Sequence, residues 1–201
     1  IYHTKSVTEK NWQITPSRFF TLNVSKPLSA QTYKSALLLP LSISVLCLMI
    51  LLVRHITQPN WRLDTLDVGQ GLATLIVKNG KGVLYDTGSA WQGGSMATLE
   101  ILPYLQHEGI ALEKVILSHD DNDHSGGTTA ILQAYPNAEL ITPSQKNYAE
   151  HHHTFCTAGR EWHWQDLHFQ ILSPKNIVAR ADNPHSCVIL VSDGTFRVLL
   201  T

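Results

Sequence analysis

The 201-residue sequence is short of charged residues and of cysteine. Only 15% of its residues are Asp, Glu, Lys or Arg, 43% are hydrophobic, and the formal net charge is −1. A chain this apolar is not intrinsically disordered, and one with so little net charge is not a basic protein that coats nucleic acid. The three cysteines include no C-x-x-C pair, which excludes a thiolate zinc finger and a disulfide-stapled scaffold. We expect Cys187 to pack in the core and Cys156 to lie exposed in a loop.

Charge is absent altogether between Lys34 and Arg54. The run ALLLPLSISVLCLMILLV at residues 36–53 is 18 residues long. As a helix it spans about 27 Å, close to the roughly 30 Å of a bilayer core. The run therefore predicts a transmembrane helix, with a buried core helix as the alternative. Residues 1–35 lack clear periodicity and are predicted to form a membrane-flanking loop.

The two parts of the chain differ in charge. Residues 1–60 carry six basic residues and one acidic residue, whereas residues 61–201 carry nine basic and fifteen acidic residues. Near the apolar run, three Lys or Arg precede it and two follow it, and the cytoplasmic flank of a membrane helix usually carries the larger number. This bias places the C-terminal domain on the non-cytoplasmic side of the cell (inner) membrane.

Residues 61–201 carry the pattern of a mixed α/β domain. Runs rich in Leu, Val and Ile predict strands at 62–68, 73–77, 83–85, 114–117, 140–141, 168–172, 188–191 and 196–200. The Asn79-Gly80 pair predicts a hairpin, and alternating histidines and aromatic residues at 162–169 predict a second one, with base stacking by a tryptophan as an alternative role. Helices are predicted at 96–108 and 128–135. The order of elements favours an α/β sandwich with its helices outside the sheets.

The most informative segment is SHDDNDHSGG at residues 118–127, directly after an apolar strand. Five potential ligands fall within six residues: His119, Asp120, Asp121, Asp123 and His124. Two neutral imidazoles with two or three carboxylates suit Zn, Mn or Fe, and a bound cation offsets the repulsion among the carboxylates. The glycine pair permits a tight turn and a close approach of the next helix. The alternative is an acidic surface loop with two incidental histidines.

This segment and five others resemble, in order and spacing, the motifs of ComEC-type proteins, the membrane channels for DNA internalisation in natural transformation. HxDxDH is similar to the HxHxDH signature of the metallo-β-lactamase fold, with Asp121 in place of the usual second histidine. The other matching motifs are LDVGQG at 66–71, VLYDTG at 83–88, ILPYL at 101–105, NPHSCVIL at 183–190 and FRVLLT at 196–201. The resemblance covers residues 61–201. It implies a metallo-β-lactamase-like αββα sandwich, incomplete, preceded by one transmembrane helix at 36–53.

The sequence departs from the family pattern at several places. Leu72 stands where members often have Asp, and the chain stops at Thr201, where the family continues into a Gly-Asp whose carboxylate bridges the metals. The first residue is Ile1, and neither the large upstream membrane region of the family nor an N-terminal DNA-binding domain is present. We therefore expect a fragment truncated at both ends, a weak or inactive nuclease until it is extended past Thr201.

The resemblance implies a dinuclear site for two divalent metal ions, Zn or Mn. His119 and Asp121 would hold one ion, Asp123 and His124 would hold the other, and His185 is a candidate for a further ligand. Asp121 and Asp123 are the expected catalytic residues. The implied activity is metal-dependent hydrolysis of the DNA strand that is not imported. The implied partners are DNA and the membrane, with other competence proteins and self-association as further candidates.

Other polar residues have open roles. Asn183 competes with His185 as a ligand, and either could be an ordinary loop residue. Asp86 could support a metal-bound histidine or simply form a turn. Asp67 is expected to bond the backbone of the glycine turn, and the histidines at 151–153 are expected in a solvated loop.

Two functional classes remain open at this point. The first is a membrane-tethered hydrolase acting on DNA, and the second is a non-catalytic structural or channel module with an incomplete metal site. The acidic excess of residues 61–201 would repel phosphates, and two divalent ions would offset part of it locally. A thiolester or lactone hydrolase of the same fold is disfavoured by the apolar run and the VGQG motif.

Overall fold

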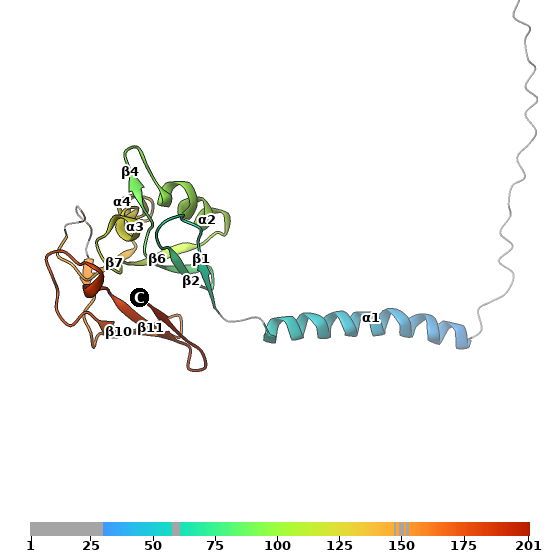
Figure 1. The fold of residues 1–201 in the computed structure, drawn as a ribbon. Helices are drawn as coiled ribbons and strands as arrows, with labels where there is room; N and C mark the ends of the chain where they lie inside the picture. The colour runs from blue at the N-terminus through green and yellow to red at the C-terminus, as the bar shows by residue number, and fades with distance from the viewer. Residues whose placement is uncertain (1–29, 58–60, 147, 149–150, 152) are drawn as a thin grey trace, which may run out of the picture. The chain divides into compact units, whose positions relative to one another are not determined.

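The computed structural model describes residues 30–57, 61–146, 148, 151 and 153–201, without the side chains of residues 30–39 and 54–57. The chain divides into two units, Ile1–Thr57 and Gln58–Thr201 (Figure 1). Most of the predicted membrane-flanking segment 1–35 lies outside the described residues.

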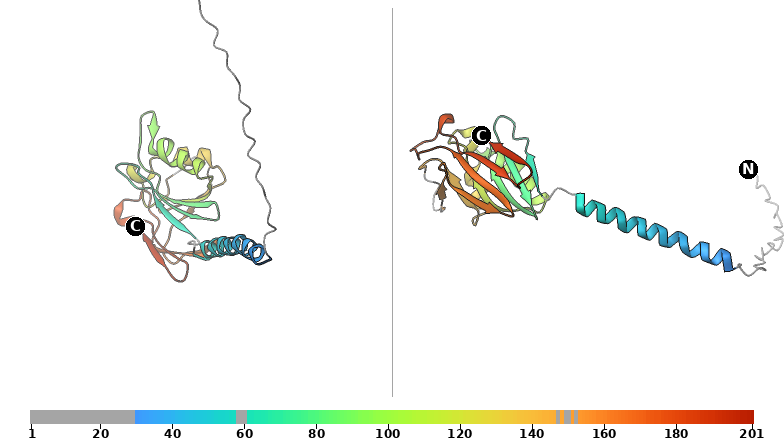
Figure 2. Two further views of the ribbon diagram at one scale, coloured as in Figure 1. Left: turned by 90° about the vertical axis from the view of Figure 1, so that its right-hand side faces the viewer. Right: turned by 90° about the horizontal axis from the view of Figure 1, so that it is seen from below.

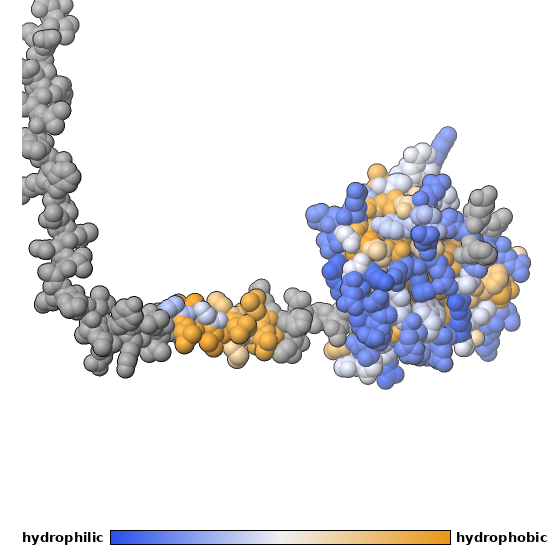
Figure 3. Space-filling view, turned by 180° about the vertical axis from the view of Figure 1, so that it is seen from behind, coloured by the Kyte–Doolittle hydropathy of each residue, from blue (hydrophilic) through white to orange (hydrophobic). Residues whose placement is uncertain are grey.

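The first unit contains one long helix, α1 (Ala30–Thr57), with Pro40 inside it. The Ser44 hydroxyl donates to the Pro40 carbonyl at 2.8 Å. Large apolar side chains between Leu41 and Val53 are exposed, and they give this stretch the apolar surface in Figure 3. Within the described part of the chain, no helix is both long and apolar enough to cross a membrane. The side chains of residues 36–39, which belong to the predicted 36–53 span, lie outside the described residues.

The second unit is built on two main sheets. The first has the order β1-β2-β3-β6-β7-β8. Its strands are β1 (Arg62–Thr65), β2 (Thr74–Lys78), β3 (Lys81–Tyr85), β6 (Ala111–Ile116), β7 (Glu139–Thr142) and β8 (His153–Phe155). The second sheet has the order β12-β11-β10-β9. Its strands are β9 (Glu161–Trp164), β10 (Leu167–Ser173), β11 (Val188–Ser192) and β12 (Arg197–Leu200). A small ribbon pairs β4 (Ala90–Trp91) with β5 (Gly94–Ser95).

The helices of this unit are short. They are the π-helix η1 (Ala97–Ile101), α2 (Leu102–His107), α3 (Asn122–Ser125), α4 (Thr128–Ala134) and the 3-10 turn η2 (Asn183–His185). One buried cluster packs η1, α2 and α4 on one face of the six-stranded sheet, and a second fills the space between the two sheets (Figure 2). Among the described residues no α-helix follows α4, so the layers formed are helix, sheet and sheet. The predicted α/β sandwich is confirmed.

Both predicted hairpins are present. β2 and β3 pair across Asn79 and Gly80, which take φ angles of +53° and +73°. The hairpin of β9 and β10 places Trp162 opposite Phe169, and their rings stack with centroids 5.0 Å apart. Each hairpin was predictable because its partners are close neighbours in the sequence.

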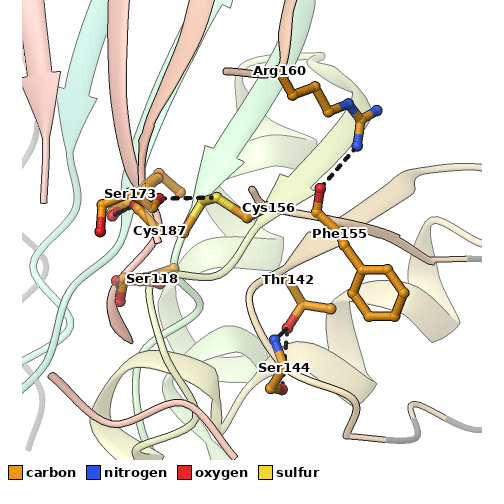
Figure 4. Close-up of a disulfide and its surroundings, with 10 residues drawn as sticks. Ser118, Thr142, Ser144, Phe155, Cys156, Arg160, Ser173 and Cys187 are labelled. Carbon is orange, nitrogen blue, oxygen red and sulfur yellow. Dashed lines mark hydrogen bonds between the residues drawn. A yellow bond between two sulfur atoms is a disulfide. The ribbon is translucent and has the colours of Figure 1, made fainter. Parts of the chain in front are cut away.

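Two expectations from the sequence are wrong. Cys156 is fully buried and forms a disulfide with Cys187, with a Cα–Cα distance of 5.8 Å (Figure 4). An odd number of cysteines is compatible with one such bond, which leaves Cys47 as a free cysteine. His153 lies at the start of β8 and is half-buried, not in a solvated loop, because β8 adds a parallel strand to the edge of the first sheet.

Candidate functional site

The candidate site lies where two parallel strands end. β3 and β6 run side by side in parallel, with Tyr85 opposite Ile116. Asp86 therefore follows one strand at the edge where Ser118 and His119 follow the other. The carboxyl ends of parallel strands are the usual location of binding sites in such sheets.

Asp86 is the buried centre of the site. Its side chain is fully buried, and Oδ1 accepts a bond from the Ser118 amide at 2.6 Å. Oδ2 accepts the Ser118 hydroxyl at 2.7 Å and faces His124 Nδ1 at 2.7 Å. The hydrogen bond to Asp86 raises the pKa of His124 against the opposing effect of burial, and the charges of Asp123 and Asp121 add to the rise. Asp86 is thus a partner of a candidate ligand and not only a turn residue.

The Asp86–Ser118 pair also fixes the tautomers of both histidines. A carboxylate only accepts, so His124 carries its proton on Nδ1. The single Ser118 hydroxyl proton goes to Asp86, so Ser118 Oγ accepts from His119 Nδ1, which lies 2.8 Å away. Each neutral imidazole then keeps its lone pair on Nε2, as a metal ligand requires.

The two Nε2 atoms each face a carboxylate of the same loop. His119 Nε2 lies 3.5 Å from Asp121 Oδ2, and His124 Nε2 lies 3.7 Å from Asp123 Oδ2. The two imidazole rings are themselves neighbours, with centroids 4.2 Å apart. The loop therefore brings four of the predicted ligands together as two imidazole–carboxylate pairs.

The fifth predicted ligand, His185, lies on η2. Its segment runs along the loop, since the Asp120 amide donates to the Ala181 carbonyl at 2.9 Å and the Cys187 amide donates to the Ser118 carbonyl at 2.8 Å. His185 Nδ1 is buried and has no hydrogen-bond partner among the described residues. The same segment carries Arg180, which donates to Asp121 Oδ1 at 3.1 Å.

The donor set suits divalent metal ions in kind. Imidazole nitrogens with ordered tautomers and carboxylate oxygens are typical ligands of Zn and Mn. The number of clustered donors is small. Among the described residues, no group of three or more His, Cys, Asp or Glu is arranged to hold a metal ion. What the loop provides is two pairs of donors, with the unpartnered His185 nitrogen in the adjoining segment.

Asp120 is one of the five potential ligands in the sequence, but in the structure its role is to hold the loop in place. Its carboxylate is buried and accepts bonds from Ser144 Oγ at 2.9 Å, Tyr148 Oη at 3.3 Å and the Ala181 amide at 2.7 Å. Burial is the largest cause of the raised pKa of Tyr148, and the charge of Asp120 adds to it. Asp120 thereby ties the loop to two other segments, and no local signal distinguishes it from its neighbours.

Glycines allow the loop to pack closely. A Cβ at Gly71 would lie 2.3 Å from the Asp123 carbonyl oxygen, and one at Gly127 would lie 2.4 Å from the Thr87 carbonyl oxygen. The VGQG turn is thus pressed against the site loop. Asp67 accepts the Gly69 amide at 3.2 Å, so its predicted structural role is confirmed.

Comparisons with known proteins identify the family of this chain. A family model described as the metallo-beta-lactamase superfamily matches residues 66–201. Recombination protein 2 of Haemophilus influenzae is 67% identical over all 201 residues, which cover 26% of that protein. Competence protein ComA of Neisseria gonorrhoeae is 34% identical over 136 residues, 67% of this chain and 18% of that protein. The predicted resemblance to ComEC-type competence proteins is confirmed, and the chain spans about a quarter or less of these relatives' length.

A solved structure shows the fold. A HARLDQ-motif mutant metallo-β-lactamase from Cronobacter sakazakii superimposes with a TM-score of 0.51 at 15% identity. The superposition covers 72% of this chain and 62% of that one. At this identity the likeness concerns the arrangement of sheets and helices alone.

Proposed function

The chain belongs to the metallo-β-lactamase superfamily, and on that premise we propose that residues 61–201 form a metal-dependent phosphodiesterase that acts on DNA during its uptake. The observation that carries the proposal is the pair of ordered imidazoles, each with Nε2 turned toward a carboxylate. The similarity to a competence protein supports DNA as the substrate, and the strand that is not imported is the proposed target.

In this proposal His119 and Asp121 would hold one divalent ion, Asp123 and His124 would hold a second, and His185 would add a further ligand. Zn or Mn would supply Lewis acidity toward the phosphodiester. Asp86 and Ser118 hold both imidazoles in the ligating tautomer.

The partly exposed carboxylates of Asp121 and Asp123 accept the proton that an attacking water releases. Arg180 lies at the rim, 70% exposed, and can leave Asp121 for a substrate phosphate oxygen, which guanidinium binds well.

We further propose that the protein is associated with the inner membrane through residues 36–53, with the folded domain on the non-cytoplasmic side. Large apolar side chains between Leu41 and Val53 are exposed on all sides of the helix. A helix of this kind needs an apolar environment. DNA and the membrane are the proposed partners, and other competence proteins or a second copy of the chain are further candidates.

The test is metal-dependent cleavage of linear DNA in detergent by this chain and by the chain extended past Thr201, which the sequence predicts to be the more active form. We expect His119→Ala and Asp123→Ala to lower cleavage and metal content by about tenfold or more. His163→Ala and Asp166→Asn are matched controls, because both side chains are exposed away from the loop. Equal activity in all four variants would reject the site.

The alternative function is a non-catalytic structural or channel module. It is favoured by the small number of clustered ligands and by the Arg180–Asp121 pair, which neutralises one of the carboxylates. Wild-type protein that binds Mn or Zn at the loop without cleaving DNA would support this alternative over the nuclease.

A further inference from the structure

The disulfide lies at the centre of the second unit. Cys156 and Cys187 are both fully buried, in the cluster that fills the space between the sheets (Figure 4). Their 5.8 Å Cα–Cα distance is within the ordinary range for a disulfide. The bond joins the segment after β8 to the segment before β11, 31 residues further along the chain.

The main chain on both sides of the bond is fixed to the framework of the candidate site. The Cys187 amide donates to the Ser118 carbonyl at 2.8 Å, and the Cys187 carbonyl accepts the Tyr85 hydroxyl at 2.7 Å. The Cys156 amide donates to the Thr142 carbonyl at 2.9 Å, at the end of β7. The disulfide therefore joins the ends of β3, β6 and β7 through one covalent link.

The segment that this link holds is otherwise weakly secured. Residues 180–187 contain only the three-residue turn η2, and Arg180 is 70% exposed. The Ala181 amide and carbonyl bond Asp120 at one end, and Cys187 bonds Ser118 at the other. His185 lies between these two anchors. Without the disulfide, the second anchor would depend on these hydrogen bonds, on the burial of Cys187 and on its neighbour, strand β11.

We infer that Cys156 and Cys187 are an oxidative modification site whose closure positions residues 180–187 against the 118–124 loop, and that a protein disulfide oxidant outside the cytoplasm closes it. The inference rests on the proposed function for the role of the loop and on the proposed non-cytoplasmic side for the oxidant, but the effect of the bond on the segment is independent of both.

In the reaction, a Cys thiolate attacks the oxidant's disulfide, and the second Cys thiolate then displaces the oxidant from the mixed disulfide. The two cysteines lose two protons and two electrons, and the oxidant's disulfide becomes two thiols. Such bonds persist in oxidising compartments and are rare in the cytosol. Because both sulfur atoms are buried, reductant reaches them only after local opening.

The first test counts thiols in the full chain expressed in its native membrane, denatured and labelled with a maleimide polymer. We expect one labelled cysteine, Cys47, before reduction and three after reduction. Three labelled cysteines before reduction would overturn the inference. Cys47→Ala is the matched control, with none before reduction and two after it.

The second test is hydrogen exchange of the oxidised and reduced full chain without added metal. We expect the Ala181 and Cys187 amides to exchange about tenfold faster or more after reduction, while amides of β2 and β3 keep their protection. Unchanged exchange at both amides would overturn the positioning role. A Cys156→Ala/Cys187→Ala chain should match the reduced form at Ala181. Neither readout uses DNA cleavage, so failure of the nuclease proposal is distinguishable from failure of this one.

Discussion

At the residue scale, the site depends on Asp86 and Ser118 as much as on its candidate ligands. Sequence reasoning identified His119, Asp121, Asp123 and His124 because they are neighbours in one short segment. The positions of Asp86, 32 residues before Ser118, and of Ala181, 61 residues after Asp120, follow only from the folded sheet. The role of Ser118 could not be predicted, since a serine before a histidine has no distinctive pattern.

We predict that Asp86→Asn weakens Zn or Mn binding by about 10- to 100-fold, the range typical of residues that orient metal ligands. The side-chain amide introduced by this substitution would donate to His124 Nδ1, which moves the imidazole proton to Nε2. Ser118→Ala should perturb His119 and leave the Asp86–His124 bond in place. Competition titration of metal affinity measures both effects. Asp67→Asn, in an exposed turn, is the control, and an equal loss in that variant would contradict the prediction.

We predict that Gly71→Ala lowers the free energy of unfolding by about 2 kcal/mol or more, because the added Cβ collides with the Asp123 carbonyl oxygen at a φ of +139°. Gly80→Ala is the matched control. Gly80 also has a positive φ, +73°, but no atom of the described part of the chain beyond its neighbours lies within 4 Å of the added Cβ, so only the conformational cost of about 1 kcal/mol applies. Urea unfolding measures both variants, and equal losses would show that crowding at Gly71 has no effect.

At the element scale, strands with a clear apolar pattern were predictable, and the short strand β8, which lacks such a pattern, was not. The β2–β3 hairpin follows from Asn79-Gly80. β8 has no such signal, because it is three residues long and pairs in parallel with β7. The predicted helix at 96–108 begins as the π-helix η1, a widening that apolar spacing does not reveal. The disulfide was missed for a related reason, since it joins cysteines brought together by the two sheets.

The Glu139 carboxylate links strands at the β8 edge of the first sheet. The stability of the folded domain should therefore depend on pH. Burial raises the pKa of Glu139, but bonds from Lys114 and Thr154 and the charge of Arg160 outweigh it and lower the pKa overall. Glu139 thereby joins β6, β7 and β8. A lowered pKa means that its stabilising effect is full above the unfolded-state value of about 4.3 and is lost as the pH falls through the folded-state value.

We predict that Glu139→Gln is less stable than the wild type at pH 7 and that the difference shrinks as the pH falls from 5 to 3. Because Glu139 is about a third exposed, the difference at pH 7 should be about 1 kcal/mol or less. Urea unfolding over this pH range measures it. Glu161→Gln, on the edge strand β9, is a control. A constant difference at all pH values would show that the Glu139 charge does not contribute.

At the scale of the whole molecule, the two units differ in the surface they present. On the face shown in Figure 3 the second unit is mostly hydrophilic, whereas the described side chains of α1 are mainly apolar and exposed. Sequence predicted this division because an uncharged run and an acidic domain are visible in composition alone. The orientation across a membrane could not be predicted firmly, since it rests on a difference of one basic residue.

We predict that the full chain sediments with membranes and resists carbonate extraction, and that deletion of residues 36–53 moves it to the supernatant. The physical reason is the transfer of about 18 uncharged, mainly apolar residues from water. Immunoblotting of the fractions measures the outcome. A chain with three serines replacing Leu48, Leu51 and Leu52 tests apolarity without shortening the helix. Extraction of the unaltered chain by carbonate would contradict the prediction.

The site loop is held in part by its main chain. The Asp123 carbonyl accepts the Leu72 amide at 3.2 Å, and the His124 carbonyl accepts the Thr87 amide at 2.7 Å. These bonds do not depend on which side chains stand at positions 121 and 123. A single substitution there can therefore alter the ligand set while the backbone stays in place. In evolutionary terms, the side chains that this loop presents can therefore change faster than its shape.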